Sequence, residues 1–327
     1  MGMLIKGQLV EDWLDKEISD GDFKRMESSF RSWVTADGSA GSTGNSGFNA
    51  EANRYHLYVS KACPWAHRTV IFRKRKQLED VIGLSIVEPD MLDDGWTFSS
   101  DGDYVDHLHA YKFMYEVYTR ADKNFTGQIT VPVLWDKKLN TIVNNESSEI
   151  IRMLNSAFNA FTEDKTDYYP EPLRKQIDAI NQSIYDNINN GVYRCGFAKS
   201  QAAYERAFDR LFIELDNVES MLSENRYLTG KQLTEADWRL FTTLIRFDSV
   251  YVGHFKCNLK RIADYPCLSN YLRELYQLPG ISETIDMDYI KRHYYYSHTS
   301  VNPTQIIPRG PAVDFGAPHN RSEQFSH

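Results

Sequence analysis

The pattern of apolar residues changes along this chain, and that change limits the possible folds more than any other feature. Residues 55–60 alternate as a strand does, Pro64 suits the first turn of a following helix, and residues 81–87 form a second strand. A strand, a helix and a strand in close succession make a βαβ unit. After about residue 170, apolar residues recur every three to four positions, which is typical of amphipathic helices. We therefore expect an α/β domain followed by an all-α domain.

The first domain continues beyond the βαβ unit. Residues 88–128 form an irregular, aromatic insertion in which 109–118 is expected to be helical. A strand at 130–135, a returning strand at 141–143 and a helix through residue 154 follow. The predicted organisation has four parts: an extension at 1–50, a βαβ-ββα domain with an insertion at 51–160, a helical domain at 161–300 and an extended tail at 301–327.

The chain is predicted to begin with an extension that contains a loop and to end in an extended tail. The Gly- and Ser-rich run at 36–47 is loop-like, and four prolines in the last 26 residues exclude a regular helix there. The extension also carries aromatic residues that predict packing against another part of the chain: Trp13, Phe23, Phe30 and Trp33.

Composition excludes several classes of function. Of 327 residues, 37 are basic and 45 acidic, which gives a net charge of −8 and disfavours non-specific binding to nucleic acid or to an anionic membrane. No apolar run approaches the length of a transmembrane helix, and the first residues lack the pattern of a signal peptide. We expect a soluble, cytoplasmic protein whose four cysteines are free thiols.

Cys63 is the strongest candidate for a reactive group. It lies at the junction of a strand and a helix, directly before Pro64, where unpaired backbone N–H groups and the helix dipole favour a thiolate. The alternative is a buried, inert cysteine. Ala66 stands where a dithiol protein carries its second cysteine, so a mixed disulfide on Cys63 needs an external thiol, such as glutathione, to resolve it.

Two further segments are candidate binding elements. A cis bond at Val131-Pro132 would leave the Val131 backbone able to pair with an extended peptide; the alternative is an ordinary trans proline. Glu146-Ser147 precedes a helix, where Ser147 can cap and nearby N–H groups can hold a carboxylate. A plain helix cap explains the second segment equally well.

These segments occur in an order that resembles the glutathione transferase superfamily. More narrowly, the chain is similar to the xi class, the glutathionyl-hydroquinone reductases, with a thioredoxin-like N-terminal domain and an all-helical C-terminal domain. The similarity covers nearly the whole chain, and the matching segments are 63–68, 95–98, 130–136, 145–147, 190–193, 228–230, 233–237, 246–248, 251–252, 254–257, 293–294 and 302–303. No motif position departs from the family pattern.

The resemblance implies a role for each matching residue. Cys63 would be the nucleophile, and Tyr193 would act on the leaving phenol. The residues that would contact glutathione are Trp96, Gln128, Ile129, Thr130, Val131, Glu146 and Ser147. Tyr251 and Tyr294 would lie over the thiol and help to keep it ionised. Without the family pattern, each of these three tyrosines would be assigned to core packing.

The implied activity is the glutathione-dependent reduction of glutathionyl-hydroquinones, with glutathione as co-substrate, no metal and a homodimeric assembly. Cys63 and His67 share a helix face, but no other Cys or His pair has ligand spacing, so a metal is not expected. Two alternatives stay open: an omega-like thiol transferase or dehydroascorbate reductase, and a non-catalytic scaffold of the transferase type.

Overall fold

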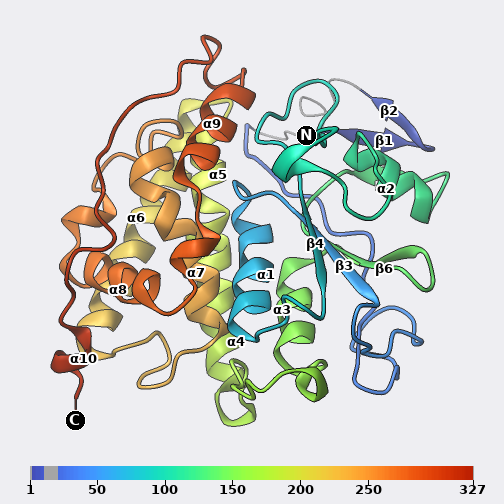
Figure 1. The fold of residues 1–327 in the computed structure, drawn as a ribbon. Coiled ribbons are helices and arrows are strands. Elements are labelled where there is room, and N and C mark those ends of the chain that lie inside the picture. Colours follow the sequence, from blue (N-terminus) through green and yellow to red (C-terminus); the bar gives the residue numbers. More distant parts are fainter. Residues whose placement is uncertain (1, 11–20, 327) are drawn as a thin grey trace. The chain divides into compact units, whose positions relative to one another are not determined.

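The computed structural model describes residues 2–10 and 21–326, so Trp13 lies outside the described residues. These residues form two compact units (Figure 1). The first contains residues 2–10, 26–167 and 286–293, and the second contains residues 21–25, 168–285 and 294–326. The boundaries expected at residues 51, 161 and 301 remain predictions.

The first unit contains the predicted βαβ-ββα arrangement. Its sheet has the strand order β4 (Gly83–Ile86), β3 (Tyr55–Val59), β6 (Val133–Asp136) and β7 (Thr141–Asn144). Strand β3 is parallel to β4 and antiparallel to β6, which is antiparallel to β7. Helices α1 (Pro64–Arg75) and α3 (Ser147–Ser156) pack side by side against this sheet (Figure 1). All five residues of β3 are buried, as expected for a central strand covered on both faces.

The helix in the insertion begins later than predicted. Helix α2 spans Met114–Ala121 instead of 109–118, after the short 3₁₀ turn η2 (Gly102–Tyr104). The Asp106 carboxylate accepts hydrogen bonds from the backbone N–H groups of Leu108 and Tyr111, and Ala110 has a positive φ of 54°. These bonds hold residues 106–111 in a turn, so a helix cannot begin there.

The extension begins with two short strands that the sequence analysis does not predict. Strands β1 (Met3–Ile5) and β2 (Gln8–Val10) form a hairpin, and β1 also pairs with β5 (Gly127–Gln128). Later in the extension, Phe30 packs against Phe125 and Tyr118, at centroid distances of 5.5 and 6.0 Å. The prediction that its aromatic residues pack on the rest of the chain is confirmed for Phe30.

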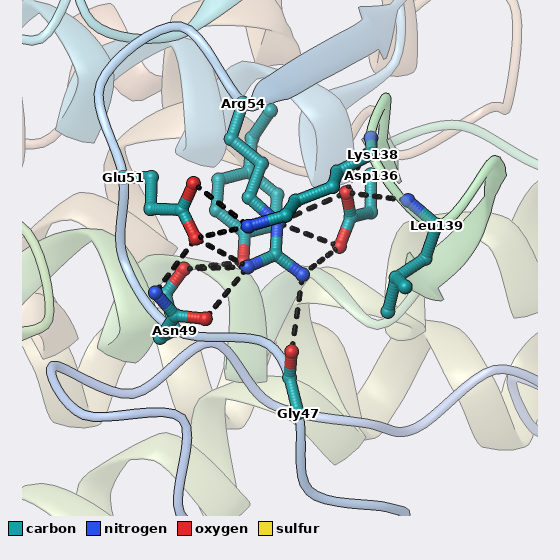
Figure 2. Close-up of polar contacts among 8 residues, drawn as sticks. Gly47, Asn49, Glu51, Arg54, Asp136, Lys138 and Leu139 are labelled. Atoms are coloured by element: carbon teal, nitrogen blue, oxygen red, sulfur yellow. Dashed lines mark hydrogen bonds and ion pairs between the residues drawn. The ribbon is translucent and has the colours of Figure 1, made fainter.

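A buried arginine fixes the end of the extension to the sheet (Figure 2). The Arg54 guanidinium donates to the fully buried Asp136 carboxylate, with the Nε–Oδ2 distance at 2.9 Å. It also donates to Asn49 Oδ1 at 2.7 Å, to Glu51 Oε1 at 2.9 Å and to the Gly47 carbonyl at 3.0 Å. One side chain thereby joins the loop before β3 to the end of β6.

The second unit is helical, as predicted. Its main helices are α4 (Arg174–Ile184), α5 (Gly191–Gly196), α6 (Gln201–Glu224), α7 (Glu235–Arg246) and α8 (Pro266–Gln277), with π-helical turns at η5 (Tyr185–Asn189) and η6 (Phe247–Tyr251). Short 3₁₀ turns lie at η3 (Asn159–Phe161), η4 (Glu171–Leu173), η7 (Ile262–Asp264) and η8 (Ser282–Thr284), and η3 belongs to the first unit. Helix α9 (Met287–Ser297) contributes residues to both units.

The tail is not entirely extended. A four-residue helix, α10 (Arg321–Gln324), follows the last proline, so the exclusion of helix from the tail is wrong at this point. The fully buried Arg321 donates to the carbonyl groups of Leu222, Asn225 and Arg226, which accounts for the docking of the tail on the second unit. Among the described residues, no helix combines the length and the apolar character needed to cross a bilayer.

Candidate functional site

Cys63 lies where the sequence predicted, at the junction of β3 and α1. It is the N-cap residue of α1, Pro64 follows in the first turn, and that turn carries no acidic side chain. The thiol is half-buried, and its Sγ donates to the Val131 carbonyl at 3.4 Å. The positive end of a twelve-residue helix favours negative charge on this sulfur.

Val131 presents its backbone beside Cys63. The Val131-Pro132 peptide bond is cis, so the alternative of an ordinary trans proline is wrong. Among the described residues, no group accepts a hydrogen bond from the Val131 N–H. Its carbonyl accepts from the Cys63 thiol, and ionisation of that thiol removes the donor. Both backbone groups of Val131 are then able to pair with an extended peptide.

The three residues before Val131 make contacts of their own. Gln128 lies opposite Met3 in the β1–β5 pair, and the Ile129 N–H donates to the Gly2 carbonyl at 3.0 Å. The Thr130 carbonyl accepts from the Tyr118 hydroxyl at 2.8 Å. The N-terminal hairpin therefore supports this segment from one side. The predicted contact of these residues with glutathione remains a prediction.

Glu146, not Ser147, caps α3. The Glu146 carboxylate accepts from the Ser148 N–H at 3.0 Å, whereas Ser147 is the first helical residue and is buried. The expected Ser147 cap is wrong, because the longer Glu146 side chain folds back onto the exposed N–H two residues later. Burial opposes ionisation of Glu146, but hydrogen bonds from Ser148 and Ser28 and the charge of Arg68 outweigh it and lower its pKa.

Arg68 connects α1 to this end of α3. Its side chain is buried, its Nη1 donates to Ser147 Oγ at 3.5 Å, and its guanidinium lies 4.6 Å from the centre of the Trp65 ring. A buried cation beside the α3 N-terminus makes this end attractive to a carboxylate. Glu146 offers a site for an ammonium group in the same place.

Trp96 comes from the insertion and is almost completely buried. Its ring stacks on His293 of α9, with centroids 4.8 Å apart and an angle of 17° between the planes. His293 Nδ1 lies 2.8 Å from the Pro89 carbonyl oxygen. The contact holds the insertion to the part of α9 that belongs to the first unit.

Sequence reasoning missed two side chains near Cys63. The Tyr289 hydroxyl donates to the Val87 carbonyl at 2.6 Å and lies 3.2 Å from Ser60 Oγ, which accepts from the Ala62 N–H. Burial, with a smaller contribution from Cys63, raises the pKa of Tyr289. These residues hold the loop that carries Cys63. No local pattern marks Tyr289, because it follows Cys63 by more than 200 residues.

The three predicted tyrosines form one cluster in the second unit. The Tyr294 hydroxyl lies 2.7 Å from that of Tyr193 and 3.1 Å from that of Tyr251. Burial raises the pKa values of Tyr251 and Tyr294 well above 10, with a further contribution from Tyr193. Both phenols therefore stay neutral and retain their protons. The Arg25 guanidinium lies 5.0 Å from the centre of the Tyr193 ring.

The other three cysteines have different surroundings. Cys195 and Cys257 are buried, and burial raises the pKa of Cys257 well above its usual value. Burial and the nearby Glu219 raise the pKa of Cys267. A raised pKa disfavours the nucleophilic thiolate. Cys267 also lies in the first turn of a helix, α8, but there the Glu219 carboxylate accepts from its backbone N–H at 2.7 Å. The first turn of α1 beside Cys63 carries no acidic side chain.

Comparison with known families matches both units. Residues 62–157 match the glutathione S-transferase N-terminal domain, and residues 201–274 match the glutathione S-transferase C-terminal domain. The chain is 54% identical to the glutathionyl-hydroquinone reductase YqjG of Escherichia coli, over 99% of this chain and 100% of that one. It is 50% identical to the glutathionyl-hydroquinone reductase PcpF of Sphingobium chlorophenolicum, over 95% and 97% of the two chains. A relative in Schizosaccharomyces pombe named glutathione S-transferase omega-like 2 is 47% identical, over 92% and 96%.

Solved structures agree with these matches. The glutathione-bound structure of E. coli YqjG superposes with a TM-score of 0.91, covering 99% of this chain and 100% of that one at 52% identity. The xi-class glutathione transferase from Natrialba magadii superposes with a TM-score of 0.90, covering 99% and 97% at 46% identity. The predicted fold, a thioredoxin-like domain followed by a helical one, is confirmed. The chain belongs to the glutathione transferase family, and within it to the xi class that contains the glutathionyl-hydroquinone reductases.

Proposed function

We propose that this protein is an enzyme that uses glutathione to reduce glutathionyl-hydroquinones to hydroquinones, through a mixed disulfide on Cys63. The observation that carries the proposal is the position of Cys63, at the N-cap of α1 and in contact with the Val131 carbonyl. Ala66 stands where a second thiol would be needed to resolve the disulfide internally. The matches to reductases of this name over nearly the full chain support the same activity.

In the first step, the Cys63 thiolate attacks the sulfur of the glutathionyl group. A Cys63–glutathione disulfide forms, the bond between sulfur and the ring carbon breaks, and its electron pair stays with the ring carbon. That carbon takes up one proton, and the hydroquinone leaves. We assign proton transfer to Tyr193, whose hydroxyl bonds to Tyr294.

In the second step, a free glutathione thiolate attacks the mixed disulfide. Oxidised glutathione leaves, and Cys63 returns as the thiolate. Overall, one glutathionyl-hydroquinone and one glutathione give one hydroquinone and one oxidised glutathione. Tyr251 and Tyr294, kept neutral by burial, would help to keep the Cys63 thiol ionised.

Glutathione would be held along its peptide part by the Val131 backbone and Trp96, and at its γ-glutamyl end by groups of opposite charge. The Val131 backbone would pair with the cysteinyl part of glutathione, and Trp96 would pack on it. Glu146 would accept from the γ-glutamyl ammonium group. The N-terminus of α3 at Ser147, with the Arg68 charge nearby, would hold the γ-glutamyl carboxylate. Gln128, Ile129 and Thr130 would line the peptide part.

Cellular setting and assembly are further parts of the proposal. We propose a cytoplasmic homodimer with no metal, no nucleic-acid partner and no membrane association. The four free cysteines suit a reducing compartment, and the net charge of −8 disfavours anionic polymers and surfaces. Light scattering after size-exclusion chromatography measures the molar mass of the assembly. A dimer should have twice the chain mass of 37.9 kDa.

Turnover with defined substrates tests the reaction itself. With glutathione and a glutathionyl-hydroquinone, we expect hydroquinone and oxidised glutathione in equal amounts, and no turnover by Cys63→Ser. Dehydroascorbate supplied in its place should be reduced far more slowly. The opposite preference would favour the omega-like alternative, and turnover of neither substrate would favour a scaffold.

A further inference from the structure

The extension lies along the edge of the sheet next to α3. Arg31 forms an antiparallel bridge with Asn144 of β7, and the Ser32 N–H donates to the Val143 carbonyl at 3.0 Å. Phe30 and Asn145 bond twice, from the Phe30 N–H to Asn145 Oδ1 at 3.0 Å and from the Asn145 N–H to the Phe30 carbonyl at 3.1 Å. Residues 30–32 therefore occupy the free edge of β7 as a short additional strand.

This pairing is fixed at a second point. Arg31 Nε donates to Glu149 Oε2 at 2.8 Å, and Asn144 Nδ2 donates to the same oxygen at 2.7 Å. Glu149 lies in the first turn of α3, where a carboxylate is also favoured by the helix dipole. The backbone of residues 28–32 is thus held against the first turn of α3.

Ser28 reaches the Glu146 carboxylate from this position. Its Oγ lies 3.0 Å from Glu146 Oε2 and 3.2 Å from the Asn145 carbonyl oxygen. A hydroxyl has one proton, and the shorter bond to the charged acceptor is the stronger. Ser28 therefore donates chiefly to Glu146.

The hydrogen bonds that the Glu146 carboxylate accepts show how the bond from Ser28 affects it. Oε1 accepts from both the N–H and the hydroxyl of Ser148, at 3.0 and 2.9 Å, which uses both of its lone pairs. Oε2 accepts from Ser28 alone among the described residues, which leaves one lone pair for a further donor. The Ser28 bond also fixes the rotation of the carboxylate, and so the direction of that lone pair.

We propose that Ser28 is a positioning residue for glutathione, because it orients the Glu146 carboxylate toward the γ-glutamyl ammonium group. The inference rests on the proposed function, in which Glu146 accepts from that group. It gives the extension a share in substrate binding, although the extension lies outside both matched family domains.

Calorimetric titration with reduced glutathione tests the proposal, using the full-length protein. We expect Ser28→Ala to raise the Kd for glutathione about tenfold, since the lost bond is to a charged group. The KM for the glutathionyl-hydroquinone, whose glutathionyl group occupies the same site, should rise in parallel, while kcat at saturation stays within about twofold. Ser28→Thr, which keeps the hydroxyl, should restore most of the affinity.

Ser29→Ala is the matched control, because Ser29 is exposed and its side chain has no hydrogen bond to the described residues. It should leave the Kd, the KM and the melting temperature unchanged.

The pH dependence of binding gives a second readout. As the pH falls, glutathione binding by Ser28→Ala should weaken at a higher pH than glutathione binding by the wild type, because Glu146 has lost one hydrogen bond to its ionised form.

The outcomes separate the two proposals. If the wild type binds no glutathione, the proposed function itself fails. If the wild type binds and Ser28→Ala binds equally well, the positioning role is contradicted. Weaker binding that Ser28→Thr does not restore, together with a lowered melting temperature, would mean that Ser28 only holds the extension in place.

Discussion

At the scale of single residues, the Tyr294 hydroxyl joins two other phenols, at 2.7 Å from Tyr193 and 3.1 Å from Tyr251. Burial keeps Tyr251 and Tyr294 neutral by raising their pKa values. A chain of neutral phenols can donate hydrogen bonds and pass a proton without holding a fixed charge. This suits the proposed role of Tyr193 as the group that supplies a proton to the leaving ring.

Replacement of Tyr193 by Phe tests that role. We expect kcat to fall by roughly 10²–10⁴-fold, the usual contribution of a positioned acid or base. The Kd for glutathione should stay unchanged, because Tyr193 is assigned to the ring and not to the peptide. Steady-state kinetics and calorimetry measure the two effects.

Tyr204→Phe is the control, since Tyr204 bonds to the Lys256 carbonyl at 2.7 Å, away from the three phenols. It should leave both kcat and the Kd for glutathione unchanged. An unchanged kcat in Tyr193→Phe would remove Tyr193 from the mechanism.

At the scale of elements, Arg54 joins the loop before β3 to the end of β6 (Figure 2). Its carboxylate partner Asp136 is fully buried, whereas Glu51 is partly exposed. Removal of one partner of a buried ion pair leaves the other charged and desolvated. The stability of this junction therefore depends on the Arg54–Asp136 pair more than on the contact with the partly exposed Glu51.

Replacement of Arg54 by Met should lower the free energy of unfolding by about 3–5 kcal/mol, because Asp136 is left without its main partner. Lys138→Ala removes an exposed contact with Glu51 and should cost at most about 1 kcal/mol. Urea unfolding of the two variants measures the difference, and equal losses would show that the buried pair is not the main support of the junction.

Most elements near the site could be predicted, because local patterns specify them. Pro64 marks the start of α1, and Thr234 with Asp237, three residues later, has the spacing of the capping box that begins α7. The contribution of Ser28 could not be predicted, because it depends on a pairing between residues 30–32 and β7 across more than 100 positions. The Glu146 cap was missed because Ser is the commoner cap, and sequence alone does not show which side chain turns back.

At the scale of the whole molecule, the two units draw on distant parts of the chain. The first unit takes residues 286–293 from near the C-terminus, and the second takes residues 21–25 from the extension. Such exchanges leave no periodic signal in the sequence. The break between α/β and helical patterns was predictable, whereas the assignment of these short segments was not.

Stability of the whole chain should depend on pH through His56. Burial lowers the His56 pKa to about 4, from 6.5, and its Nε2 lies 2.8 Å from Ser85 Oγ. The unfolded chain therefore binds a proton near pH 6.5 that the folded chain does not bind until about pH 4. The resulting stability is complete above pH 6.5 and is lost as the pH falls toward 4.

Urea unfolding at about pH 7 and about pH 5 measures this effect. Between these values, the wild type should lose about 2 kcal/mol more than His56→Gln, which has no group that titrates there. An equal loss in both proteins would show that His56 does not carry the dependence.

The proposed reaction requires that Cys63 take the glutathionyl group from the substrate. The decisive measurement is the intact mass of the protein after incubation with a glutathionyl-hydroquinone, without free glutathione. We predict a gain of one glutathionyl group in the wild type, none in Cys63→Ser, and loss of the adduct when glutathione is added. A folded wild type that binds glutathione but gains no mass, or an adduct that persists in Cys63→Ser, would contradict the role of Cys63.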